Sequence, residues 1–87
     1  MSSVKKAARK NAGQLIAWSA VGRRLRELRG LYTNQAEFAQ RIGVSQGYLS
    51  LAERGEVEIG AEILLRISRE CKKSLEWLLA GDDGIKR

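Results

Sequence analysis

The stretch from Asn34 to Gly55 constrains the fold more than any other part of the chain. Apolar residues recur at helical spacing on both sides of Gly43-Val44-Ser45, so two short amphipathic helices must meet at a sharp corner. Gly43 can leave the first helix with a positive φ, which glycine adopts without a steric penalty. Ser45 is a good N-cap for the second helix. The pattern therefore predicts a helix-turn-helix over residues 34–55, with its second helix over 45–54.

The ends and the facing sides of the two predicted helices also carry signals. Asn34, with Glu37 three positions later, is a capping-box pattern that starts the first helix. Ala39 is small, as the closest point of two steeply crossing helices requires, and Val44 and Leu49 should fill the angle between them. On the second helix, Leu49 and Ala52 are predicted to face inward, and the side chains predicted to face outward are those of Gln46, Gly47, Ser50, Leu51 and Arg54.

An outward face of short polar side chains suits the major groove of DNA, which is about 12 Å wide. The flanking sequence agrees with this interpretation: Gly22-x-x-Leu25-Arg26-x-Leu28-Arg29 precedes the motif, and Ile63-Leu64-Leu65-Arg66-Ile67 and Ser74-Leu75-Glu76-Trp77-Leu78-Leu79-Ala80-Gly81 follow it. Over roughly residues 20–81 the chain resembles the lambda-repressor/Cro-like, or XRE-like, helix-turn-helix family. This resemblance implies an all-α, five-helix DNA-binding domain with an extended N-terminal helix or arm.

The chain of 87 residues has room for one modest core. We expect a helix-turn-helix domain over 15–81, a basic N-terminal arm or helical extension over 1–14, and a polar tail over 82–87. One helix from about 12 to 29 is the simplest reading of the apolar spacing, although Ser19 as an N-cap offers a later start. The fourth and fifth helices are expected at about 60–72 and 74–80.

The net charge of +6 is concentrated near the N-terminus. Residues 1–29 hold eight basic residues and one acidic residue, whereas residues 30–87 hold eight basic and nine acidic ones. Attraction to phosphate should therefore come mainly from the first third of the chain. The arm would follow the DNA backbone or enter a minor groove, and the alternative is a solvated leader. Its cations are Lys5, Lys6, Arg9 and Lys10, and further arginines on the polar side of the next helix are Arg23, Arg24 and Arg26.

Gln46 is the strongest candidate for reading bases. A glutamine in the first turn of a recognition helix can pair with adenine through N7 and N6. Ser50 lies one turn further on, and Leu51 would rest on a thymine methyl or form the centre of a protein-binding face. Because no Lys or Arg lies deep in this face, we expect a half-site richer in A·T than in guanine contacts. The base-reading candidates are Gln46, Gly47, Ser50 and Leu51.

Contacts to the DNA backbone are assigned partly by the resemblance, which implies that Gln35 holds a phosphate. The amide groups at the start of both motif helices would add neutral phosphate contacts. Tyr48 would pack its ring along the helix pair with its hydroxyl near a phosphate, or be purely structural. Besides the cations of the arm, the backbone candidates are Gln35, Arg41, Ser45, Tyr48 and Arg54.

One recognition helix touches only a few base pairs. The resemblance implies the family's solution, a homodimer on a near-palindromic site with recognition helices about 34–36 Å apart. Trp18 either covers the core of its own domain or joins an apolar patch against a second copy. Trp77 and Leu78 should close the core. The possible dimer surface comprises Leu15, Ile16, Trp18, Leu75 and Leu79.

Other function classes lack support in the sequence. The chain has no histidine, and its lone cysteine, Cys71, cannot form an intramolecular disulfide and is expected to be a small core residue. No catalytic constellation is recognisable. We therefore expect that the protein is not an enzyme and that it binds no metal, cofactor or small-molecule effector. Without a signal peptide or a long apolar run, the protein should be cytoplasmic, associated with the nucleoid and independent of membranes.

One competing hypothesis belongs to a different class. The same fold could serve as a protein-interaction module or antitoxin that holds a partner protein. Leu51, the nearly neutral second helix and the apolar segment around Trp18 favour it. The two hypotheses differ in salt response, because binding to DNA through several cations weakens steeply as salt rises.

Overall fold

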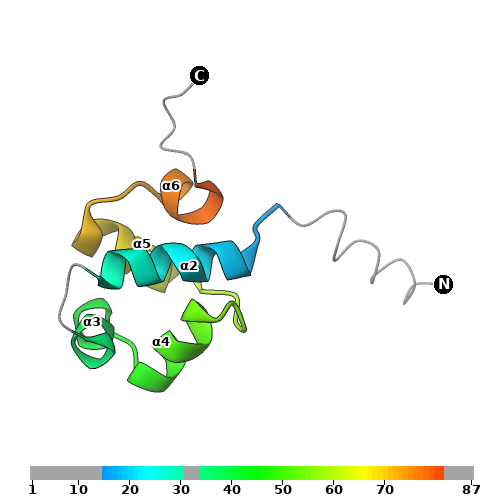
Figure 1. Ribbon diagram of the computed structural model, residues 1–87. Helices are drawn as coiled ribbons and strands as arrows, with labels where there is room; N and C mark the ends of the chain where they lie inside the picture. The colour runs from blue at the N-terminus through cyan, green and yellow to red at the C-terminus, as the bar shows by residue number, and fades with distance from the viewer. Residues whose placement is uncertain (1–14, 31–33, 82–87) are drawn as a thin grey trace.

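The computed structural model describes residues 15–30 and 34–81, so the predicted arm over 1–14, residues 31–33 and the tail over 82–87 lie outside the described residues. Within the described ranges the chain forms five helices and no strand (Figure 1). The predicted all-α, five-helix fold is confirmed. The helices are α2 (Trp18–Arg29), α3 (Gln35–Ile42), α4 (Gln46–Glu53), α5 (Ala61–Cys71) and α6 (Leu75–Ala80).

Most helix ends form where the sequence places a cap. The side-chain oxygens of Asn34, Ser45 and Ser74 each accept a hydrogen bond from the amide three residues on, at 2.8, 3.0 and 3.0 Å. Each cap satisfies an amide that the first turn of a helix leaves without a partner. Gly43 and Gly81 end α3 and α6 in the left-handed region, with φ of 78° and 77°. These boundaries depend on a few neighbouring residues, and the sequence predicted them correctly.

The simplest predicted start of the first helix, at about residue 12, is wrong, and the helix begins close to the later start that was the alternative. Residues 15–17 are not helical, and α2 begins at Trp18 with Ala17 as an extended N-cap whose side chain makes no capping bond. In extended backbone, alternate side chains point to the same side. Accordingly Ile16 packs against the core with Trp18, whereas Leu15 is 94% exposed.

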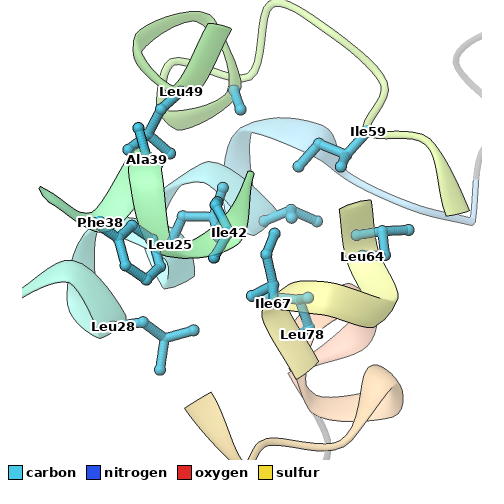
Figure 2. Packing of buried hydrophobic residues seen from close by; sticks show 12 residues of the cluster. Leu25, Leu28, Phe38, Ala39, Ile42, Leu49, Ile59, Leu64, Ile67 and Leu78 are labelled. Carbon is cyan, nitrogen blue, oxygen red and sulfur yellow. The ribbon is translucent and has the colours of Figure 1, made fainter. Parts of the chain in front are cut away.

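The core gathers side chains from all five helices (Figure 2). α2 lies between α4 and α6, and α3 contacts both α4 and α5. Leu49 of α4 points towards Ala39 of α3 at the corner of the motif, as expected, and Val44 packs against the same cluster. The buried residues are Val21, Leu25, Leu28, Phe38, Ala39, Ile42, Leu49, Ala52, Ile59, Leu64, Ile67 and Leu78.

The backbone of α2 touches the end of α4 at a glycine. Gly22 is buried, and a Cβ at this position would overlap the Glu53 carbonyl oxygen and lie 2.7 Å from that of Ala52. Just beyond α4, Gly55 has a φ of 75°, and a Cβ there would lie 2.6 Å from the Ser19 Cα. These close approaches fix the last turn of α4 against α2, so the position of the second motif helix depends on them.

We predict that replacing glycine by alanine has opposite effects on the free energy of unfolding at Gly22 and at Gly47. Gly22→Ala should lower the free energy of unfolding by about 1–3 kcal/mol, because α2 and α4 must move apart. Gly47→Ala should raise it by about 0.5–1 kcal/mol, since alanine is the better helix former and the nearest atom to its Cβ is the Ser45 Oγ at 4.0 Å. Urea unfolding of both variants measures the difference. Equal effects would contradict the close approach at Gly22.

Candidate nucleic-acid interface

The first turn of α4 is its accessible part. Gln46 and Gly47 are exposed, whereas Leu49 and Ala52 are buried as predicted. Ser50 and Leu51, predicted to face outward, are half-buried. The surface that α4 offers to a partner is therefore narrower than expected, and it is concentrated at the N-terminal end of the helix.

Gln46 is already hydrogen-bonded to a second glutamine. Its Nε2 donates to the Gln35 Oε1 at 3.1 Å. Gln35 is the first residue of α3 and Gln46 the first residue of α4, so the bond joins the N-terminal ends of both motif helices. The structure thus brings together the residue predicted to read bases and the residue assigned to phosphate by resemblance.

A buried carboxylate lies behind this pair. The Glu53 side chain is only 4% exposed, and its Oε1 accepts from the Gln35 Nε2 at 3.1 Å. The Arg29 guanidinium donates to both Glu53 oxygens, from Nε at 2.7 Å and from Nη2 at 3.1 Å. Hydrogen bonding to Glu53 raises the pKa of Arg29, since it favours the charged guanidinium. Four side chains from three helices are connected in this way.

Glu53 was not among the site residues predicted from the sequence. A signal was present, because Glu53 follows Leu49 by four residues and so lies on the inward stripe of α4. A charged residue on that stripe requires a buried partner. The partner is Arg29, the last residue of α2, which only the folded chain brings close.

Two predicted contacts to the DNA backbone lie in ion pairs. Arg41 contacts Glu70 at 3.0 Å and Glu37 at 3.8 Å. Arg54 donates to the Glu56 carboxylate at 3.1 Å and to the Ser50 Oγ at 2.7 Å. About half of each arginine side chain is exposed, at 47% and 51%. Such surface pairs contribute little to stability.

Arg24 has a structural role that was not predicted from the sequence. Its Nη1 donates to the Leu78 carbonyl at 3.0 Å, and its guanidinium lies against Gly81 at the end of α6. A cation at this end is favourable because the last carbonyls of a helix carry partial negative charge. Arg23 and Arg26 are exposed. Of the three arginines predicted on the polar side of this helix, Arg24 is therefore half-buried and bound to α6.

The remaining predicted backbone contacts differ in accessibility. Ser45 is exposed, with its Oγ accepting from the Tyr48 amide, and the half-buried Tyr48 packs against the core. The cations Lys5, Lys6, Arg9 and Lys10 lie outside the described residues.

The candidate dimer residues separate into two groups. Ile16, Trp18 and Leu79 are half-buried and pack against the core of their own domain. Leu15 and Leu75 remain exposed, at 94% and 40%. Trp18 thus follows the first of its two predictions, a cover for its own core, and Leu15 and Leu75 are the exposed members of the predicted dimer surface.

Neither a metal cluster nor a membrane-spanning helix is present in the described part of the chain. Residues 15–30 and 34–81 contain no cluster of three or more His, Cys, Asp or Glu side chains that could hold a metal ion. None of the described helices has the length and apolar character needed to cross a membrane. Cys71 is half-buried and packs against the core, as predicted.

Comparison with known proteins decides the family. The sequence model of a helix-turn-helix family matches residues 23–78, which is more than half of the chain. The chain belongs to this helix-turn-helix family. A crystal structure of the P22 c2 repressor protein in complex with a synthetic operator is similar, with a TM-score of 0.66 and 38% sequence identity over 71% of this chain and 96% of that chain. The comparison with curated proteins found no match.

We predict that two glutamates paired with arginine differ sharply in their effect on stability. Glu53→Ala should lower the free energy of unfolding by about 2 kcal/mol, because it removes charge-assisted hydrogen bonds from a buried site. Glu56→Ala removes a carboxylate that is 54% exposed and should cost less than about 0.5 kcal/mol. Urea unfolding tests both variants. A loss at Glu53 no larger than that at Glu56 would contradict the buried pair.

Proposed function

We propose that this helix-turn-helix protein is a sequence-specific transcription regulator that binds double-stranded DNA with α4 in the major groove. The observation that carries the proposal is the exposed first turn of α4, where Gln46 stands paired with Gln35. The similar P22 c2 repressor is in complex with an operator, which supports the same partner here. Family and neighbour both mark a non-enzymatic regulator. Such a role agrees with the cytoplasmic, nucleoid-associated location expected from the sequence.

Phosphate would be held at the N-terminal ends of α3 and α4. Helix N-termini favour anions because their first amides point outward and the helix dipole is positive there. Gln35 uses one N–H on Glu53 and its oxygen on Gln46. Its second N–H is the group we assign to phosphate. These contacts would position α4 without conveying sequence.

Base reading would rest on Gln46, with Ser50 and Leu51 beside it. The Gln46 amide offers an acceptor and a donor to adenine N6 and N7. Ser50 already accepts from Arg54, so its own O–H is the group left for a base edge. The Arg54 guanidinium is held on Glu56 and Ser50 near the end of α4. The first turn of α4 therefore carries no Arg or Lys for bidentate recognition of guanine. An A·T-leaning half-site follows.

A homodimer on a near-palindromic operator would complete the function. A single helix covers too few base pairs for a specific site, and two-fold symmetry doubles the contacts. The exposed Leu15 and Leu75 are the apolar groups that we assign to the partner copy.

We predict that selection from random duplexes will enrich a near-palindrome with A·T pairs under the first turn of α4. Half-site centres should lie about one DNA turn apart, about 34–36 Å. Affinity for the selected site should fall by about 10³-fold or more between 50 and 200 mM salt if six or more phosphates are contacted. The experiment is sequencing of the bound pool, followed by titration at several salt concentrations.

Two results would overturn this proposal. A selected motif dominated by guanine under the first turn would refute the A·T reading. Failure to enrich any site, together with salt-insensitive binding to a partner protein, would favour the protein-interaction module or antitoxin.

We also predict that Gln46→Ala lowers affinity for the selected operator by about tenfold or more, since one bidentate base contact is worth about 1–3 kcal/mol. Gln40→Ala is the matched control. Gln40 is exposed on α3, five positions after Gln35 and therefore about 140° around the helix. Its replacement should leave affinity unchanged. Fluorescence anisotropy measures both, and equal affinities for the two variants would exclude Gln46 from base reading.

A further inference from the structure

We infer that the buried carboxylate of Glu53, acting through Gln35, fixes the orientation of the Gln46 side-chain amide. This orientation decides where the amide oxygen and nitrogen lie relative to the bases. Glu53 and Arg29 are thereby positioning residues for sequence specificity, although both are remote from the first turn of α4. The inference rests on the proposed function, because it concerns the same recognition helix. It adds two residues to that function that no feature of the exposed surface reveals.

The carboxylate of Glu53 determines the orientation of the Gln35 side-chain amide. A carboxylate paired with a guanidinium is an acceptor only. Both of its oxygens accept from Arg29, and Oε1 also accepts from Gln35. If the Gln35 amide were turned over, its oxygen would face the carboxylate oxygen at hydrogen-bond distance. At a site that is 4% exposed, little water is present to relieve that repulsion. The Gln35 nitrogen must therefore point to Glu53.

The orientation of the Gln35 amide in turn sets that of the Gln46 amide. With its nitrogen on Glu53, Gln35 presents its oxygen to Gln46, and the 3.1 Å contact is favourable only if the Gln46 nitrogen faces that oxygen. One N–H of Gln46 is then occupied. The other N–H and the Oε1 of Gln46 remain for contact with a base. The donor and the acceptor then lie in a fixed order along the groove. Adenine presents an acceptor at N7 and a donor at N6 in the major groove, so the set order matches one orientation of the base pair.

The positions of these residues on the helices make the relay possible. Gln46 and Glu53 are the first and last residues of α4. Seven residues are close to two helical turns, so both side chains lie on the same side of α4. Gln35, at the start of α3, contacts both of them, and Arg29, at the end of α2, holds Glu53. The relay thus links the contact between α2 and α4 to the base-reading end of α4.

The test compares Glu53→Gln in two backgrounds. This variant keeps the shape of the side chain but adds a donor, so the Gln35 amide no longer has one required orientation. In the Gln46 protein, affinity for the selected operator should fall about tenfold. In the Gln46→Ala protein, the same change should alter affinity less than twofold. Glu62→Gln is the matched control, since it removes one negative charge from an exposed pair with Arg66 and should have no effect in either background.

An equal loss in both backgrounds would show that Glu53 serves stability alone and would overturn the inference. Because Glu53→Gln could prevent folding, Gln35→Met provides a second variant that leaves the Arg29–Glu53 pair intact. It should lower the preference for A·T over T·A at the Gln46 contact by about tenfold. Loss of a phosphate contact alone would weaken binding to both duplexes equally, and that result would contradict the relay.

A measurement without DNA separates this inference from the proposed function. The side-chain amide resonances of Gln46 should shift in Glu53→Gln and remain in place in Glu62→Gln, as ¹H–¹⁵N spectra of the free proteins would show. Unchanged Gln46 resonances in Glu53→Gln would refute the relay even if the protein binds its operator. If the resonances shift but no duplex is ever selected, the relay exists and the proposed function fails.

Discussion

The contact between α2 and the last turn of α4 is the constraint on which the rest of the structure depends. Gly22 lets the two backbones approach closely, and Arg29 reaches the buried Glu53 beside it. A buried ion pair is stable only when its hydrogen-bonding groups are satisfied, because desolvating two charges is costly. Here the two oxygens of Glu53 accept three hydrogen bonds. Sliding α4 along α2 would break these hydrogen bonds, so the pair fixes one position for α4.

This anchoring gives the two ends of α4 different properties. Its C-terminal end is buried under α2, whereas its first turn is exposed and carries Gln46. A rigid helix transmits the position of one end to the other, so fixing Glu53 also fixes the place of Gln46. Precision at a recognition surface comes from such support by neighbouring elements. Residues that never reach the DNA thus belong to the proposed recognition machinery.

The parts of the fold that depend on near neighbours could be predicted from sequence. Asn34, Ser45 and Ser74 cap helices because a side-chain oxygen reaches an amide three residues away. The bonding partners of Arg24 and Glu53 could not be predicted in this way. Arg24 bonds to a residue 54 positions away and Glu53 to one 24 positions away. Within the candidate site, Gln46 and Gln35 were identified singly, but their pairing depends on how α3 packs against α4.

The distribution of charge implies that affinity and specificity have different sources. In the described structure, Arg41 and Arg54 lie beside carboxylates, and residues 30–87 have nine acidic residues against eight basic ones. The motif itself therefore attracts phosphate weakly. The surplus of positive charge lies in residues 1–29, away from the base-reading turn in sequence. Since salt screens charge attraction but not the order of donors and acceptors, added salt should weaken binding to all duplexes while leaving the preference set by Gln46 in place.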